Sequence, residues 1–227
     1  MSSSIVLNGQ VGLLSSHNLL AAGGALFSVN TPSPGTGVAY AQLTSFSATA
    51  NGLFVISNNN SANGGKNIIL DRLSLFETAA VATGTAISFE VYNETGIVAG
   101  TTAVATRTPV QINTGSGYSQ TTGAVVQAFS AGAITIPAAV GTRRLQGQAW
   151  IPVGVNVVKD NYVLDFGIDG PTQSRTGLTA ARATDTARCV GAMNPIIIAP
   201  QTTSWINCWG LGTSTPSFEY NLTYFEV

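Results

Sequence analysis

Charged side chains are scarce in this sequence. Asp, Glu, Lys and Arg together make up 8% of the 227 residues, against roughly 25% in typical soluble chains. Disorder normally requires high charge and low hydrophobicity, and 44% of the residues here are hydrophobic, so we expect a folded chain. A surface of small neutral groups is cheaper to desolvate against a partner. The composition therefore favours a chain that other subunits cover, with an extracellular β-protein as the alternative.

Positive charge is also lacking, which excludes one class of partner. The chain has two lysines, Lys66 and Lys159, and a net charge of −1. Its densest basic features are Arg143–Arg144 and a scattered group of arginines within residues 175–188 that Asp185 interrupts. Binding to a phosphate backbone requires clustered Lys or Arg. We therefore predict no nucleic-acid binding.

Long hydrophobic runs are missing as well. No apolar stretch reaches the roughly 18 residues that a transmembrane helix needs, so we predict no membrane span. The N-terminus lacks the positive region of a signal peptide, and polar residues at 8–10 and 15–16 break its apolar stretches. We expect a mature protein made in a cytoplasm.

Residues that support catalysis or bind metals are few. The only histidine is His17, and no nucleophile-elbow motif accompanies it, so we expect it at a surface or interface. Cys189 and Cys208 are too few for a disulfide framework or a metal set. They either form one bridge or are reduced and buried, and we favour the second, with Cys208 on a strand.

The acidic residues give weak signals only. Asp165 and Asp169 are a weak calcium candidate, for which ordinary turn capping is the preferred interpretation. Glu77, Glu90 and Glu219 lie on the polar sides of amphipathic strands, where we expect a solvated or interface role rather than the paired carboxylates of a glycosidase. We predict that the chain is not an enzyme and that it has no cofactor and no metal site.

Strand signals recur along the whole chain. Residues 86–92 and 217–225 alternate between apolar and polar positions. The other predicted strands are 52–57, 67–77, 124–129, 133–136, 148–158, 162–168 and 203–209. A helix has one candidate, residues 174–188, where Gly177 and four threonines argue against it.

Turns rich in Gly, Pro, Asn and Ser separate these strands, at 31–37, 58–65, 114–117 and 212–217. Many short, one-sided strands are typical of an all-β protein built as an antiparallel β-sandwich, here jelly-roll-like. We predict an extended N-terminal arm, residues 1–34, followed by a β-sandwich domain, residues 35–227. The large residues of strand 217–225 should lie in the core.

Trp205 and Trp209 share one side of the predicted strand TSWINCWG. If exposed, the two rings form a platform on which a sugar can stack. If buried, they are anchors of the core or of an interface, a role in which Trp is enriched, and we favour this second interpretation.

The arm, the strands, the low charge and the loops rich in Ala, Thr, Gly and Asn resemble virion proteins of tailed bacteriophages. The nearest resemblance is to head decoration (cement) proteins, and it lies in composition and style across the whole chain. It implies a small β-rich structural protein, often a homotrimer, that sits on the capsid surface and bridges subunits of the major capsid protein. A carbohydrate- or receptor-binding module, of tail or adhesin type, is the alternative.

An assembly role gives a set of candidate interface residues. Short apolar pieces broken by Gly and Ser are too apolar for a free tail, so we expect the arm to contact another subunit. The candidate interface residues are Ile5, Val6, Leu7, Leu13, Leu14, Leu19, Leu20, Trp205 and Trp209.

Overall fold

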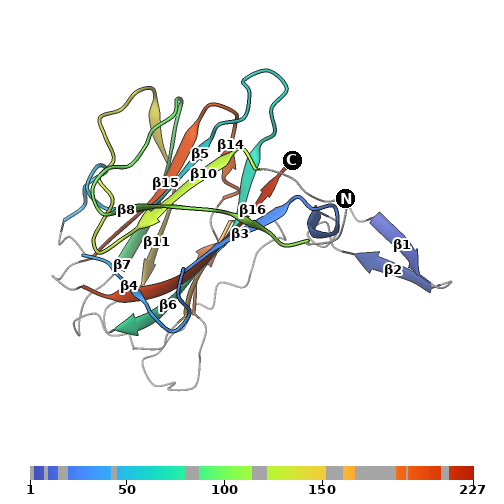
Figure 1. Ribbon diagram of the computed structural model, residues 1–227, viewed down its shortest axis with the longest axis horizontal. Coiled ribbons are helices and arrows are strands. Elements are labelled where there is room, and N and C mark those ends of the chain that lie inside the picture. The colour runs from blue at the N-terminus through green and yellow to red at the C-terminus, as the bar shows by residue number, and fades with distance from the viewer. Residues whose placement is uncertain are drawn as a thin grey trace.

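The chain is almost entirely β-structure. The computed structural model describes residues 3–7, 10–14, 20–41, 45–79, 87–113, 122–151, 161–166, 188–192, 194–210 and 215–227. Two large sheets pack face to face, and a separate two-stranded sheet is formed near the N-terminus (Figure 1). The predicted all-β sandwich is confirmed.

Six strands form the first sheet, in the order β11-β7-β15-β5-β10-β8. Their bounds are Arg143–Ile151 (β11), Ile87–Glu94 (β7), Thr203–Gly210 (β15), Gly52–Asn58 (β5), Ala124–Phe129 (β10) and Val104–Arg107 (β8). All neighbouring strands in this sheet run antiparallel. Every residue of β5 is buried, so this central strand is covered on both faces.

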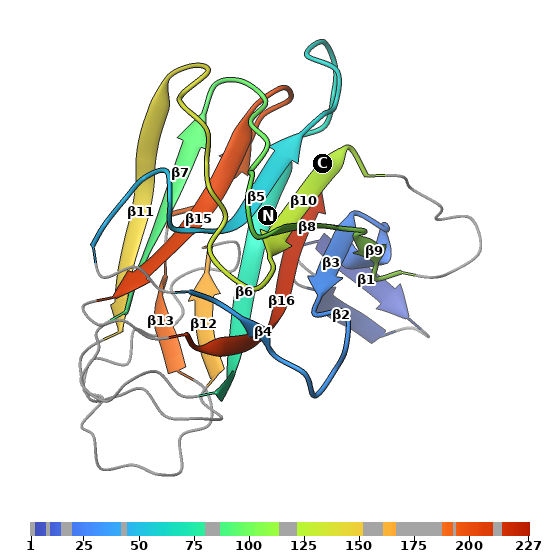
Figure 2. The ribbon, with the colours of Figure 1, turned by 60° about the vertical axis from the view of Figure 1, so that its left-hand side comes forward.

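The second sheet has the order β13-β12-β6-β16-β3-β9, with β14 beside β6 and β4 beside β16. Its strands are Arg188–Ala192 (β13), Asn161–Asp165 (β12), Ile68–Ala79 (β6), Ser217–Glu226 (β16), Leu26–Asn30 (β3), Val110–Gln111 (β9), Ile197–Ile198 (β14) and Val38–Ala39 (β4). Among the described strands only β12 and β13 pair parallel. Figure 2 shows this sheet behind the other, with β16 and β6 near its middle.

Large aromatic residues fill the space between the two sheets. Phe54 on β5 and Phe129 on β10 meet Tyr220 on β16, with ring centroids 5.1 and 5.5 Å apart. The inward-facing residues of β16 are Phe218, Tyr220, Leu222 and Tyr224, each at most 4% exposed. Burial alternates along most of β16, as expected for a strand with one face in the core. The prediction that residues 217–225 are a core strand is confirmed.

The N-terminal region divides into a hairpin and a strand of the sandwich. β1 (Ser3–Leu7) and β2 (Gln10–Leu14) pair antiparallel and project from the body of the molecule (Figure 1). By contrast, β3 pairs with β16 and β9, and its Phe27 and Val29 are buried. The predicted arm of residues 1–34 therefore extends too far, because residues 26–30 form a strand of the sandwich and residues 26–29 are buried.

Other predicted elements differ in their ends. β11 begins at Arg143, ahead of the predicted strand 148–158. Residues 133–136 form isolated bridges to Gly52 and Thr101 rather than a strand. Residues 152–158, 167–168 and 174–187 lie outside the described part of the chain. No helix among the described residues has the length and hydropathy required to cross a bilayer.

Candidate functional site

Trp205 lies on the outer face of the six-stranded sheet and is nevertheless fully buried. Phe54 points toward Tyr220 in the opposite sheet, so its neighbour Val55 points away from that sheet. Val55 is the register partner of Trp205, which places both on the outer side. Trp209 lies four residues after Trp205 on β15, so its side chain is on the same side of the sheet. We call this surface the covered face.

A buried ion pair holds one edge of the covered face. Arg143 donates from Nε and Nη2 to Glu94 Oε2, at 3.0 and 2.8 Å. The backbone N–H groups of Val140 and Gly141 donate to Glu94 Oε1. Glu94 is 1% exposed, and these four hydrogen bonds offset the desolvation of its charge. The Arg143 guanidinium also lies 4.4 Å from the ring centroid of Trp205, a cation–π contact.

Glu90 lies at the centre of the covered face. Its Oε1 accepts hydrogen bonds from Ser88 Oγ, from Trp209 Nε1 at 2.6 Å and from Gln148 Nε2 at 3.4 Å. Its Oε2 is buried and has no hydrogen-bond partner among the described residues. Asn207 is the cross-strand partner of Glu90. Its Nδ2 and Oδ1 are also buried and have no hydrogen-bond partner among the described residues. Burial raises the pKa of the Glu90 carboxyl above its ordinary value.

Loops cover this face from above. The ring of Phe46 packs on Tyr92 and Trp209, with centroids 6.3 and 6.2 Å apart. The Val98 backbone hydrogen-bonds with side chains of β5 and β15. Ile134 is fully buried, and its backbone exchanges two hydrogen bonds with the start of β5. The loops therefore turn an outer sheet face into a second core.

The two tryptophans do not form an exposed platform. Trp205 is fully buried, with the Tyr92 ring stacked on it at 5.6 Å. Trp209 is half-buried, and its indole N–H donates to Glu90. Trp205 is thus an anchor of its own chain's core, not a candidate for an interface with another chain.

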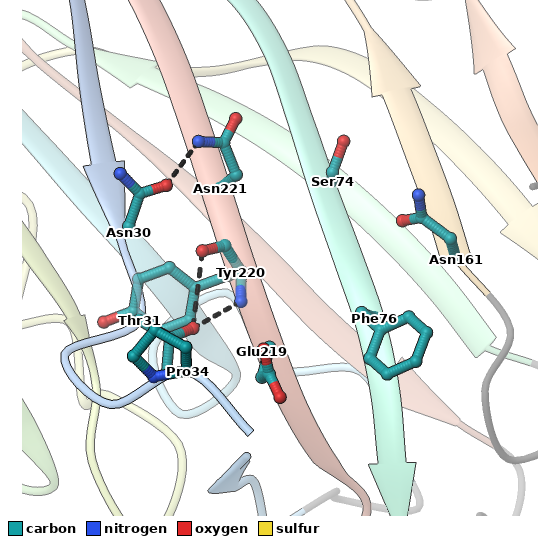
Figure 3. Close-up of a pocket in the computed structure, with 9 residues that line it drawn as sticks. All are labelled: Asn30, Thr31, Pro34, Ser74, Phe76, Asn161, Glu219, Tyr220 and Asn221. Atoms are coloured by element: carbon teal, nitrogen blue, oxygen red, sulfur yellow. Dashed lines mark hydrogen bonds between the residues drawn. The ribbon is translucent and has the colours of Figure 1, made fainter. Parts of the chain in front are cut away.

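The outer face of the eight-stranded sheet carries a groove. Figure 3 shows the residues that line it, from β3 and the loop after it, and from β16, β6 and β12. Its volume is about 320 Å³. Strand register sets six of the lining side chains in two rows. The rows are Asn30–Asn221–Ser74 and Glu219–Phe76–Asn161. We call this surface the groove face.

Several polar groups of the groove are not fully paired. Asn221 Nδ2 donates to Asn30 Oδ1 (dashed line in Figure 3). Glu219 Oε1 accepts from the Gly35 N–H at 3.0 Å. Asn161 Oδ1 is buried and has no hydrogen-bond partner among the described residues. The groove thus presents amide, hydroxyl and carboxylate groups that can bond a ligand.

The groove is also nearly uncharged, and one of its residues is an exposed aromatic. Among its lining residues, only Glu219 carries a formal charge. Phe76 is 39% exposed although it lies in the middle of a polar surface. The groove face therefore combines neutral hydrogen-bonding groups with one accessible ring.

The predicted interface residues of the N-terminal region lie mostly in the hairpin. Ile5, Val6 and Leu7 are in β1, and Leu13 and Leu14 are in β2. Leu19 lies outside the described residues, and Leu20 is half-buried at the start of a short helical turn. The hairpin is a sheet of its own, and no described strand of the sandwich pairs with it.

The acidic residues depart from the prediction of solvated or interface roles. Glu77 is fully buried and accepts a hydrogen bond from the Tyr162 hydroxyl at 2.8 Å. Glu90 is 2% exposed, because loops cover the polar side of its strand. Only Glu219, in the groove, is half-buried. The predicted role is thus wrong for Glu77 and Glu90.

The remaining candidates have simpler outcomes. Cys208 is a free, buried thiol, as predicted, and burial raises its pKa. Asp169 and His17 lie outside the described residues. Within the described part of the chain, no three His, Cys, Asp or Glu side chains are grouped closely enough to hold a metal ion.

Comparison with known proteins gives no relative. The chain matches no protein-family model, no curated protein and no solved structure. Its function must therefore be inferred from the hairpin and the two sheet faces themselves.

Two features were missed by sequence reasoning. The burial of Glu90 had a signal, because the strand opposite it carries Trp205 and Trp209 on the same side as Asn207. Two large aromatic residues on a nominally polar side indicate that something covers that side. The groove had no such signal, because it depends on how β6, β16 and β12 align.

Proposed function

We propose that this chain is a structural subunit of a virus particle, decorating the capsid surface and bridging neighbouring capsid subunits. The observation that carries the proposal is the apolar hairpin β1–β2, which stands outside the sandwich (Figure 1). The resemblance to head decoration proteins supports a location on a virus particle. The hairpin supports binding to neighbouring subunits through this segment.

The hairpin has the properties of a segment that needs a partner. Val6 lies opposite Val11, and Leu13 and Leu14 lie opposite Ser4 and Ser3. A two-stranded hairpin alone in water is marginally stable at best. Both of its outer edges are free of described strands, and a free strand edge is a template for pairing with another chain. Docking on a neighbouring subunit would bury its apolar residues and pair these edges.

An exposed apolar patch lies beside the short helical turn at residues 20–22, where Asn113 Nδ2 donates to the Ala22 carbonyl. Val110 on β9 and Ile112 just after it are 58% and 48% exposed. Ile112 N–H donates to the Leu26 carbonyl at 3.0 Å, which fixes this segment beside β3. We propose that this patch is a second apolar contact with a neighbouring subunit.

The low charge of the chain fits repeated contacts with subunits in a lattice. Many weak apolar and hydrogen-bonded contacts, multiplied by symmetry, provide avidity without one strong site. The partners we propose are other copies of this chain, as a trimer, and the major capsid protein. Closed rotational symmetry is the usual form of such assemblies.

The location is tested on purified particles from cells that produce the chain. We expect mass spectrometry to find the chain in the particle fraction, and immunogold electron microscopy to label the outside of the head. Gold label found only on tails would refute the proposed location on the capsid surface. Absence of the chain from purified particles would refute a virion role.

The hairpin is tested by deleting residues 2–14 and, separately, by Val6→Asp combined with Val11→Asp. We expect a folded sandwich whose affinity for its assembly falls at least about 100-fold, because two charges would have to be desolvated at the contact. Analytical ultracentrifugation and co-sedimentation with particles measure the association, and circular dichroism measures folding.

The matched control is Val140→Asp, which places a charge on a side chain 68% exposed at a loop of the sandwich. We expect this variant to associate like the wild type. If the deletion variant associates normally, the hairpin is not part of the interface and this proposal is refuted. If the deletion variant fails to fold, the sandwich needs the hairpin for its own stability, and the hairpin is not a separate docking segment.

A further inference from the structure

We propose that the groove on the eight-stranded sheet binds a neutral carbohydrate. The juxtaposition that carries this inference is an accessible aromatic ring, Phe76, within two rows of amide, hydroxyl and carboxylate groups (Figure 3). This binding activity is separate from the proposed role in a particle and uses a different surface from the hairpin.

The polar groups of the groove match a ligand that is rich in hydroxyl groups. Asn161 Oδ1 is buried without a partner among the described residues, so it lacks the hydrogen bond that a buried acceptor normally has. Asn221 uses its Nδ2 on Asn30, which leaves its Oδ1 to accept from a ligand. Glu219 uses Oε1 on the Gly35 N–H, which leaves Oε2. A sugar hydroxyl donates and accepts, so it can bond the remaining side-chain oxygens of Asn221 and Glu219.

Phe76 supplies the apolar part of the site. Its register partners are Glu219 on β16 and Asn161 on β12, so its ring lies between two hydrogen-bonding side chains. The face of an aromatic ring is electronegative and attracts the C–H groups on one side of a sugar ring, a weak contact of the C–H donor type. Hydrogen bonding around the edge and stacking on one face are the two contacts that a pyranose offers.

Charge and size narrow the class of ligand. The groove residues include no Lys, Arg or His, and one carboxylate, Glu219. Phosphate, sulfate and carboxylate ligands need cationic partners, so anionic ligands are disfavoured here. A volume of about 320 Å³ is at the low end of the roughly 300–1,000 Å³ of small-molecule sites. The site therefore fits one or two rings of a neutral oligosaccharide.

The first experiment applies the full-length chain to an array of glycans. The array carries neutral hexose and N-acetylhexosamine oligosaccharides beside sialylated and sulfated glycans. We expect binding to neutral glycans only, followed by calorimetric titration with the neutral glycan that binds most strongly. Binding to acidic glycans alone, or to none, overturns the proposal.

The second experiment locates the binding with two matched variants. Phe76→Ala should weaken the affinity for that neutral glycan by about tenfold or more, because it removes the ring on which the sugar stacks. Phe46→Ala removes an aromatic ring of similar exposure, 46% against 39%, from the covered face, and should leave the affinity within about twofold.

Both variants change exposed side chains, so circular dichroism should show the fold of the wild type in each. Unchanged affinity in Phe76→Ala would refute this groove as the site, even if the chain binds glycans elsewhere. Equal losses in Phe76→Ala and Phe46→Ala would also refute it. The outcome does not depend on whether the hairpin binds capsid subunits, so the two proposals fail separately.

Discussion

The two outer faces of the sandwich look alike in sequence and differ in structure. On β7, Ser88 and Glu90 alternate with apolar residues, and on β16, Glu219 and Asn221 do the same. On the covered face Glu90 is 2% exposed, whereas Glu219 and Asn221 line an open groove. The difference arises from the loops that carry Phe46, Val98 and Ile134 over β15 and β5.

Coverage by loops changes what the same residue types do. Beneath the loops Glu94 accepts four hydrogen bonds inside the chain, whereas Glu90 Oε2 and the Asn207 amide have no partner among the described residues. On the groove face the polar groups can leave hydrogen-bonding capacity for a ligand. The covered face therefore serves stability, and the groove face is the surface on which we propose binding.

The largest effect is expected where both faces depend on the same core. Phe218 and Leu222 are fully buried between the two sheets. Each truncation to Ala typically costs about 2–5 kcal/mol, against a net stability of about 5–15 kcal/mol. Phe218→Ala combined with Leu222→Ala should prevent the accumulation of folded protein, measured by soluble yield and circular dichroism. A folded, soluble double mutant would contradict the core assignment.

A smaller effect separates the two faces directly. Glu94→Ala removes the carboxylate partner of Arg143 and the acceptor of two backbone N–H groups, and we expect a loss of about 3–5 kcal/mol. Glu219→Ala removes one hydrogen bond, to the Gly35 N–H, with an expected loss of about 0.5–1.5 kcal/mol. Urea unfolding of both variants measures the difference. Equal losses would show that the loops do not protect the covered face.

The strands could be predicted because their periodicity is local. Residues 124–129 coincide with β10, and residues 217–225 lie within β16. The arm was harder, since Phe27 and Val29 form only a short alternating pattern between Gly24 and Pro32. Their place in the sheet depends on pairing with β16, which is almost two hundred residues away, as the Thr31–Tyr220 separation of 189 indicates.

The two faces could not be predicted, for the same physical reason. A strand's sequence tells which residues share a side, but not what lies over that side. Asn221 meets Ser74 only through the register of β16 with β6. Glu90 is 2% exposed and accepts a hydrogen bond from Trp209, on which Phe46 from a distant loop packs. Both depend on contacts between segments far apart in the chain, which periodicity does not encode.

The smallest effect concerns the pH dependence of stability on the covered face. Burial raises the pKa of Glu90 in the folded state, so between the ordinary and the raised pKa the folded chain binds more protons than the unfolded chain. The free energy of unfolding should therefore fall as pH rises through that window. Glu90→Gln cannot ionise, so its difference from the wild type should grow through the window and then become constant. Urea unfolding at a series of pH values measures this difference.

Ser88→Ala makes the same test sharper. Ser88 Oγ donates to the Glu90 carboxylate, a hydrogen bond that lowers the pKa of this group and so opposes the effect of burial. Its removal should raise the pKa further and move the pH-dependent loss of stability to higher pH. Cys208 and Tyr92 lie near Glu90 and have raised pKa values, so they stay neutral in this range and do not add to the slope. A Glu90→Gln profile parallel to the wild type at every pH would mean that water reaches the carboxylate, and the covered face would then be as open as the groove face.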